Sequence, residues 1–369
     1  AMLVTITAVA EFGAGFASSL FGVAPDKNTG LLFSVGLLVV ALVINLSGTK
    51  WLARVARIGL LAELVGVIGL GLYFLIFQRK QEFSVFFDTM GAGGESGYVA
   101  AFFGAAIAGL FMFYGFEACG DVAEEVAQPA RRVPKAMLLT ILVGGVSAFL
   151  SYAGYVLAAP DLASIVDGSN PDPIPSILEG TLGPVGTKLF LVVVMIAFIS
   201  CVLSLQAAAS RLLFSFGRDG MLPGHRWLAR VSPRSKVPVN ALVTASIIPA
   251  LLALLVWVNA DLLVSVTAFA ILGIYVSFQM VVLGSLRQRV RGWEPAGPFS
   301  LGRWGFVVNI AALAYGVFAM VLLARPGESG DIVADWIVLI GLAVVLGSGL
   351  LYLFLARPTR SSDAPAGDA

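Results

Sequence analysis

Three carboxylates stand out in this sequence because each lies inside a long apolar run: Glu11, Glu63 and Glu117. An ionisable side chain is costly in an apolar environment, so each of the three is a candidate for function. A buried carboxyl can bind and release a proton near neutral pH, and this makes Glu63 a candidate for proton coupling. Glu11 can equally be a packed or protonated carboxyl with no transport role.

The run that contains Glu117 has an unusual composition. Residues 104 to 120 hold four glycines, a central group of aromatic residues and the acid. Such a helix is easily interrupted, and an interruption exposes backbone N–H and C=O groups that can bind the ammonium or carboxylate group of a substrate. The alternative is an unbroken glycine-rich helix that packs tightly against its neighbours.

These candidates are carried by ten apolar runs, each of roughly 18 residues or more. A helix of that length, rising about 1.5 Å per residue, crosses a hydrocarbon core of about 30 Å. Backbone in hydrocarbon must satisfy its own hydrogen bonds, and barrel strands would show short alternating segments instead, so we expect helices. The sequence predicts an all-α polytopic membrane protein with spans at 2–22, 31–48, 52–77, 100–120, 136–158, 185–210, 238–258, 261–283, 304–324 and 333–355.

The composition excludes several classes of protein. Of the 369 residues, 59% are hydrophobic and 12% are charged, whereas soluble domains carry about a quarter charged residues. A net charge of +1 and a single histidine, His225, indicate neither a nucleic-acid-binding face nor a metal cluster. Cys119 and Cys201 lie far apart in apolar runs and are predicted to be free thiols in the core. No cofactor and no metal site is predicted.

Enzymes, ATP-driven pumps and channels are less compatible with the sequence than secondary transporters. An intramembrane hydrolase needs a His/Asp/Ser or paired-acid constellation, and His225 lies in a basic connection. The sequence contains no Gly-x-x-x-x-Gly-Lys-Ser/Thr loop for nucleotide binding. A channel would need a charged lining or rings of carbonyls, and the buried charges here are few and single. We therefore predict no catalytic residues.

The distribution of basic residues predicts the orientation. Of the 23 lysines and arginines, 18 fall in connections on one side of the predicted spans. The richer side is expected to be cytoplasmic. This places the protein in the plasma (cytoplasmic) membrane with a cytoplasmic C-terminus. Residues 1–356 are predicted to form a single transmembrane domain, and residues 357–369 a disordered cytoplasmic tail.

Four blocks of sequence, in this order and with these spans between them, resemble the amino acid-polyamine-organocation (APC) transporter superfamily. They are similar to the family's fourth-to-fifth helix junction, its sixth-helix signature, the end of its eighth helix and the start of its ninth. The blocks are Asn45–Lys50, Gly109–Lys135 (GLFMFYGFEACGDVAEEVAQPARRVPK), Ser210–Pro223 and Val237–Asn240. The resemblance implies twelve helices, arranged as two inverted five-helix repeats plus two further helices, working by alternating access. The ten runs would then be helices three to twelve, and the chain would begin mid-protein without its first two helices.

The resemblance also implies roles for residues of the fourth run. Phe111 would be the aromatic gate over the substrate, and the substrate ammonium would bind at main-chain carbonyls of Phe111, Met112 and Tyr114, beside Gly115. Glu117 matches the family's acid just beyond the break, which is expected to link binding to helix movement. Glu63 falls where several proton-coupled relatives have a lysine, so the charge is reversed, although a carboxyl can still carry a proton.

Together these observations predict proton-coupled uptake of amino acids, with an amino acid or polyamine exchanger as the alternative. Sodium coupling is not excluded, because Ser200 and Ser204 lie one helical turn apart; the alternative is that both hydroxyls pack between helices. The predicted partners are a small amino acid or amine and the lipid bilayer, with no nucleic acid, and the oligomeric state stays open. In the acidic loop 161–183, residues 174–182 are a candidate short helix that would cap the external vestibule, and a structureless loop is the alternative.

Overall fold

The computed structural model describes residues 1–358 except 25, 92–96, 171–172, 234, 261, 295–296 and 327–331. Regular secondary structure in these residues is entirely helical. The long helices are α1 (Met2–Phe21), α2 (Lys27–Leu46), α7 (Pro129–Ala158), α9 (Pro173–Arg218), α11 (Val239–Val258), α12 (Leu262–Val290), α13 (Trp304–Leu323) and α14 (Ile332–Ala356). The all-α prediction is confirmed. The tail that was predicted to be disordered lies outside the described residues from position 359 onward.

Nine helices in the described part of the chain are long and apolar enough to cross a membrane. One of them is composite: α3 (Thr49–Glu63) continues through a π-helical turn, η1 (Leu64–Ile68), into α4 (Gly69–Phe77). The remaining predicted span, 100–120, which is the fourth along the chain, is not a continuous helix. It is divided into α5 (Tyr98–Met112) and the short α6 (Ala118–Asp121), which favours the interrupted form over the unbroken glycine-rich helix.

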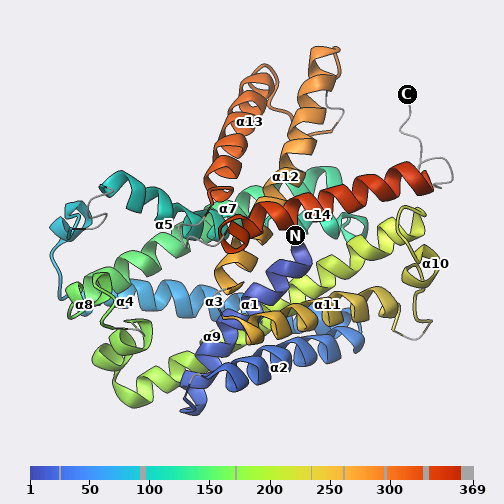
Figure 1. Ribbon diagram of the computed structural model, residues 1–369. Coiled ribbons are helices and arrows are strands. Elements are labelled where there is room, and N and C mark those ends of the chain that lie inside the picture. The colour runs from blue at the N-terminus through green and yellow to red at the C-terminus, as the bar shows by residue number, and fades with distance from the viewer. Residues whose placement is uncertain are drawn as a thin grey trace.

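Helices α1, α2, α9 and α11 pack together as a four-helix unit in which every pair is in contact (Figure 1). The helices meet through small and branched side chains, which let the backbones approach closely without cavities. Each helix contributes at least one residue to a single buried cluster, with members Ile6, Leu38, Val202 and Ala245. This unit is the most extensively buried part of the described chain, and α3 and α12 are attached to its sides.

Two buried amide side chains join α2 to α9 inside this unit. The Asn45 Nδ2 donates a hydrogen bond to the Leu203 carbonyl at 3.0 Å, and the Gln206 Nε2 donates to the Leu38 carbonyl at 3.0 Å. A buried amide left without partners would be costly, so both side chains specify the register of the two helices.

Helices α4 and α7 contact each other through backbone atoms at two glycines. A Cβ atom added at Gly154 would lie 2.6 Å from the Gly71 carbonyl oxygen, and one at Gly71 would lie 2.9 Å from the Leu150 carbonyl oxygen. Only glycine permits this approach.

The C-terminal end of α4 is covered by the first part of α9. This helix bends at Gly183, whose φ is 67°, in the left-handed region that glycine adopts readily. Before the bend, Ile177 and Leu178 are buried against Phe74 of α4 and Ala158 at the end of α7. The predicted short helix at residues 174–182 is therefore present, as the N-terminal part of α9.

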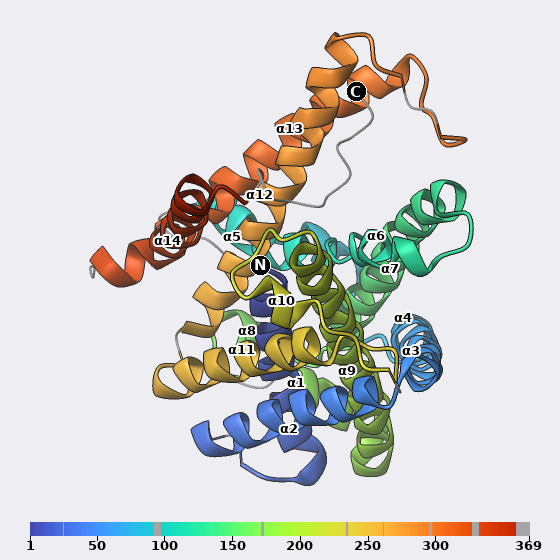
Figure 2. The same ribbon diagram turned by 90° about the vertical axis from the view of Figure 1, so that its right-hand side faces the viewer.

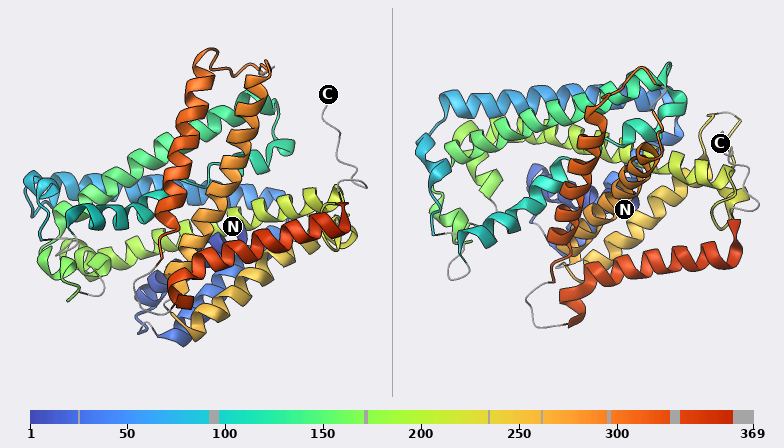
Figure 3. Two further views of the ribbon diagram at one scale, coloured as in Figure 1. Left: turned by 45° about the horizontal axis from the view of Figure 1, so that its top comes forward. Right: turned by 90° about the horizontal axis from the view of Figure 1, so that it is seen from above.

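Helices α12 and α13 run side by side as a hairpin that is steeply inclined to α2, α9 and α11 (Figure 1). Figure 2 shows the hairpin extending away from the rest of the chain, and Figure 3 gives two further views of the same arrangement. The base of the hairpin forms a second buried cluster, in which Ile271 and Tyr275 of α12 pack with Ala319 and Leu323 of α13. These two helices do not run parallel to the four-helix unit.

Candidate functional site

The interruption between α5 and α6 is the first element of the candidate site. Phe113 makes the last helical backbone bond of α5, to Gly109, and Gly115 has a φ of 102°, which a side chain would oppose. The Gly115 N–H donates to the Glu117 Oε2 at 2.8 Å. Among the described residues, no backbone N–H donates to the carbonyl oxygens of residues 110–114. Five carbonyl groups are thus free to accept hydrogen bonds from a ligand.

Aromatic side chains anchor the interruption to α1. The ring of Phe111 packs edge to face against the rings of Tyr114 and of Phe12 in α1, with distances between ring centres of 5.3 Å and 5.9 Å. The Tyr114 hydroxyl donates a hydrogen bond to Thr5 Oγ1 at 2.9 Å. Phe111 also packs against both buried clusters, so it lies where the four-helix unit meets the base of the α12–α13 hairpin.

Glu63 and Cys201 approach the same region from α3 and α9. Glu63 is exposed and is the last residue of α3 before the π-helical turn, a type of distortion that often occurs at functional sites. Cys201 lies within electrostatic range of Glu63 and of Tyr114. Cys119 and Cys201 are both free, as predicted, but Cys201 is exposed. The side chain of Cys201 is therefore not packed in the core, which corrects the prediction of a core thiol at this position.

Glu11 does not join this group. Its carboxylate interacts with the Ser34 hydroxyl of α2, and its Oε1 is buried without a hydrogen-bond partner among the described residues. The structure therefore separates the three carboxylates. Glu117 caps the interruption, Glu63 lies near Cys201, and Glu11 faces α2.

The two serines of α9 occupy different environments. Ser200 is buried, and a Cβ atom added at Gly59 would lie 2.2 Å from its Oγ. Ser204 is exposed. The close contact with α3 gives the Ser200 hydroxyl a helix-packing role, and sodium coupling stays an untested alternative.

Two ion pairs connect the segment after α6 to the end of α9. The guanidinium of Arg211 contacts both carboxylate oxygens of Glu125, at 2.5 and 3.3 Å. The guanidinium of Arg218 contacts both carboxylate oxygens of Glu124, at 3.1 and 3.2 Å. Its hydrogen bonds and charge hold the pKa of Glu124 below the usual range. These ion pairs hold the segment after α6 against the end of α9. From the sequence we expected only a loop here, so these four residues were not among the predicted site residues.

Asp121 is a further titratable group, at the start of this connection. Burial raises the pKa of its carboxyl to about 6, and the negative charge of Glu117 adds to the effect. Its Oδ2 is buried and has no hydrogen-bond partner in the described part of the chain. Nothing in the spacing of the sequence distinguishes Asp121 from the exposed acids that follow it.

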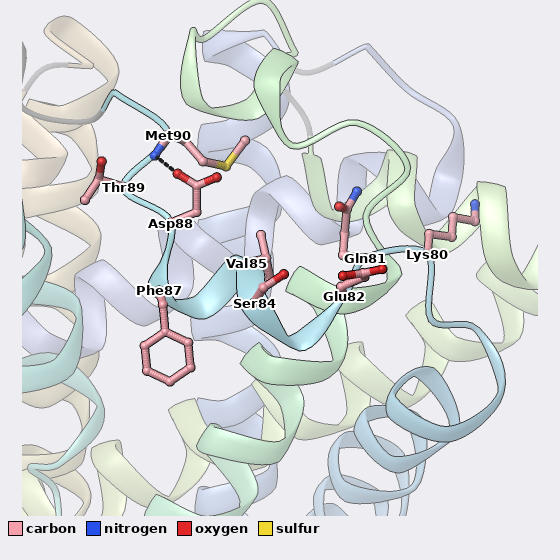
Figure 4. Close-up of a pocket in the computed structure, with 9 residues that line it drawn as sticks. All are labelled: Lys80, Gln81, Glu82, Ser84, Val85, Phe87, Asp88, Thr89 and Met90. Carbon is pink, nitrogen blue, oxygen red and sulfur yellow. Dashed lines mark hydrogen bonds between the residues drawn. The ribbon is translucent and has the colours of Figure 1, made fainter.

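A pocket of about 590 Å³ lies away from the interruption, in the connection between α4 and α5 (Figure 4). Its walls come entirely from residues 80–90, which include the 3₁₀ turn η2 (Phe83–Phe87). The Gln81 Nε2 of this segment donates a hydrogen bond to the Ala159 carbonyl at 2.9 Å. Most of the lining side chains are exposed, so the pocket is a surface feature of one connection and not part of the candidate site.

Comparison with known proteins gives matches along most of the chain. A family model described as an amino acid permease matches residues 1–347. An uncharacterized amino-acid permease of Schizosaccharomyces pombe is 29% identical over 247 residues, which cover 66% of this chain and 44% of that protein. A putative polyamine transporter of Candida albicans is 23% identical over 334 residues, covering 84% of this chain and 58% of that protein.

A choline transporter of Saccharomyces cerevisiae is 28% identical over 235 residues, which cover 63% of this chain and 41% of that protein. The chain spans about half the length of the curated relatives it matches. The names of these relatives differ in the compounds they mention, but all describe permeases or transporters. Because the family model extends over nearly the whole chain, we conclude that this protein belongs to the amino acid permease family of the APC superfamily.

Proposed function

We propose that the protein is a secondary active transporter that moves amino acids or related amines across the plasma membrane by alternating access, in symport with protons. The observation that carries this proposal is the interruption between α5 and α6. It combines free carbonyl groups at residues 110–114 with the aromatic ring of Phe111. An ammonium group donates three hydrogen bonds, and carbonyl oxygens at a helix break are suitable acceptors.

In this proposal, Phe111 closes over the substrate and the main-chain carbonyls of Phe111, Met112 and Tyr114 bind the ammonium. Gly115 permits the turn, and its N–H is held by Glu117. Movement of α6 would change this hydrogen bond, which gives Glu117 a route to link substrate binding to helix movement. Main-chain contacts of this kind recognise an amine without selecting its side chain, in keeping with the varied compounds named in the relatives.

Proton coupling is assigned to Glu63. The carboxyl is accessible, lies at a helix distortion and is near Cys201, which in turn lies near Tyr114, the ring partner of the gate residue Phe111. A single proton on this group would change the charge next to the site between the outward-facing and inward-facing states. An exchanger needs no such coupled proton, and the two mechanisms therefore differ in one measurement.

That measurement is uptake of labelled amino acids and polyamines into energised vesicles that contain the full-length gene product, with and without a protonophore. Uptake that collapses with the protonophore is the expected result for proton symport. Uptake that survives the protonophore but requires substrate inside the vesicles would identify an exchanger and remove the role assigned to Glu63. Vesicles with the same expression of the Gly115→Leu variant are the control for label that enters or adheres without using the site, because a large side chain at this φ should disrupt the interruption.

A further inference from the structure

Helix α3 has two faces with different neighbours. Gly59 and Gly66 lie against Ser200 and Val193 of α9. At 100° per residue, positions 50, 54, 57 and 61 lie on the opposite face, and positions 51, 58 and 65 lie along one flank of it. All of these side chains are exposed, including Trp51 at 52% and Leu61 at 57%. The face away from α9 is therefore not covered by another described helix.

The chemistry of this face changes along the helix. Its first two turns present Lys50, Arg54 and Arg57, and the next turns present Ile58, Leu61 and Val65. From Arg54 to Val65 the helix rises about 16 Å, close to half of a hydrocarbon core of about 30 Å. The cations thus lie at the depth of lipid headgroups when the apolar side chains lie at the depth of acyl chains.

The cations have no protein counter-ion among the described residues, since no ion pair involves Lys50, Arg54 or Arg57. The Arg54 guanidinium lies 4.8 Å from the centre of the Trp51 ring, and a tryptophan at this position is typical of the membrane interface. No Asp or Glu occurs between residues 47 and 62. The charge of this face is therefore positive and available.

A second basic segment lies beside the start of α3. A Cβ atom added at Gly48 would be 3.7 Å from the Ser235 carbonyl, so the connection between α9 and α11 passes close to this point. That connection contributes the exposed Arg226, Arg230 and Lys236 and contains no acid from residue 221 onward. The contact brings this basic connection, in which Lys236 follows Ser235 directly, close to the start of α3.

We propose that this face of α3 binds an anionic phospholipid. The phosphate lies against Lys50, Arg54 and Arg57, and an acyl chain follows Ile58, Leu61 and Val65. A soluble phosphate would use the cations but not the apolar side chains, and a protein partner would not need an interfacial tryptophan above an acyl-length stripe. Each basic residue near an anionic lipid surface strengthens binding about fivefold, so three of them favour an anionic over a zwitterionic lipid by about a hundredfold.

The test is lipid binding to the purified protein in detergent, measured by native mass spectrometry with phosphatidylglycerol and phosphatidylcholine of identical acyl chains. We expect the protein to bind phosphatidylglycerol preferentially. The triple variant Lys50→Gln/Arg54→Gln/Arg57→Gln should weaken phosphatidylglycerol binding at least about tenfold and leave phosphatidylcholine binding unchanged. A variant with Lys50→Arg, Arg54→Lys and Arg57→Lys keeps the charges and should keep the preference, which separates loss of charge from loss of folding.

The matched control is Arg131→Gln/Arg132→Gln/Lys135→Gln, which removes three exposed cations from α7 on the same predicted side of the membrane. This control should keep the lipid preference. Equal loss in both triple variants would mean that only the overall charge matters, and it would overturn the site. Displacement of phosphatidylglycerol by soluble glycerol phosphate would assign the cations to a free phosphate ligand and would equally overturn the lipid proposal.

Discussion

The carboxylate of Glu117 accepts a hydrogen bond from the amide of Gly115, two residues earlier in the chain. It therefore stabilises the interruption from within the same segment, and the carbonyl groups of residues 110–114 are left for another partner. Glu63 belongs to a different helix, α3. It lies near Cys201, and Cys201 lies near Tyr114 at the interruption. The two carboxylates thus suit different tasks, one local and one between helices.

Replacing Glu63 with glutamine tests the coupling role. We expect the Glu63→Gln variant to lose the pH-driven component of uptake and to keep substrate exchange, because the amide retains the shape of the side chain but cannot carry the proton. Uptake along an imposed pH gradient and counterflow at equal pH would be measured in the same vesicles. The control is Glu11→Gln, which alters a carboxyl that faces α2. Driven uptake that is unaltered in Glu63→Gln would refute the assignment.

Truncating Phe111 tests the gate. Loss of one aromatic contact costs about 1.4 kcal/mol, so the Phe111→Ala variant should raise the substrate concentration for half-maximal uptake about tenfold. The expression level of Phe111→Ala should change much less than its ability to retain bound substrate. Phe149→Ala is the matched control, because Phe149 is 72% exposed on α7 and has no ring partner among the described residues. If expression and retention fell together in Phe111→Ala, the residue would be a packing residue.

The raised pKa of Asp121 predicts a pH dependence of stability. Its folded pKa of about 6 exceeds the ordinary value of 3.8 because burial disfavours the charged form. The contribution of this group is therefore fully present below about pH 4 and is lost as pH rises through about 6. As pH rises over this range, the free energy of unfolding of the wild type should fall by up to about 2 kcal/mol relative to that of Asp121→Asn, measured by thermal unfolding in detergent. Glu82→Gln, at an exposed acid, should follow wild type.

At this scale the sequence and the resemblance located the interruption and its acid, but not the residues that contact it. Thr5 and Phe12 meet Tyr114 and Phe111 across about a hundred positions of sequence. Such pairs depend on how α1 is placed against the interruption, and no local pattern reports that placement. Asp121 was missed for a similar reason, since its burial arises from tertiary packing.

At the scale of elements, the close contact of α4 with α7 makes a direct prediction. The Gly154→Ala variant places a Cβ atom 2.6 Å from the Gly71 carbonyl oxygen, so the helices must separate, at a cost of about 1–3 kcal/mol in the free energy of unfolding. Gly144→Ala, on the same helix with nothing within 4 Å of the added atom, should be neutral or stabilising by up to about 1 kcal/mol. The two thermal unfolding midpoints in detergent are the measurement, and equal midpoints would contradict the contact.

Glycine content allowed the interruption between α5 and α6 but left it as one of two alternatives, because glycine weakens a helix at any position and also permits close helix packing. The π-helical turn after Glu63 was not predicted. It changes the hydrogen-bond register by a single residue inside an apolar run, and hydrophobic periodicity does not resolve so small a shift. The ion pairs Arg211–Glu125 and Arg218–Glu124 were not predicted. The sequence shows that the two segments carry opposite charges, but it does not show which charges lie close together in the fold.

For the whole molecule, the untested prediction is orientation. In a background with Cys119→Ser and Cys201→Ser, we expect Ser84→Cys to react with a membrane-impermeant maleimide in intact cells, because residue 84 lies in the connection predicted to be external. Arg291→Cys should react only after the membrane is permeabilised. Both positions are exposed, so access and not burial decides the result. The reverse pattern would invert the topology and the cytoplasmic position of the C-terminus.

Nine of the ten predicted spans have a counterpart among the long apolar helices of the described residues, since each span needs about 20 apolar residues whatever its neighbours. The limits agree less well, as α9 (Pro173–Arg218) extends beyond the predicted 185–210 at both ends. The arrangement of the spans did not follow, because lipid-facing and helix-facing sides are both apolar and periodicity cannot separate them. The inclined hairpin of α12 and α13 is an example, as nothing in its two apolar runs indicates its angle to the other helices. The inverted-repeat arrangement of the full superfamily fold stays a prediction.

The four-helix unit of α1, α2, α9 and α11 has a consequence for the kinetics of deuterium exchange. Its mutual contacts and the buried amides of Asn45 and Gln206 mean that no one helix can open without disturbing the other three. Backbone amides of this unit should therefore exchange last and together, as one cooperative block. Amides of residues 113–117 have few backbone bonds to break, and they should exchange early, at a rate that changes when a transported amine is added.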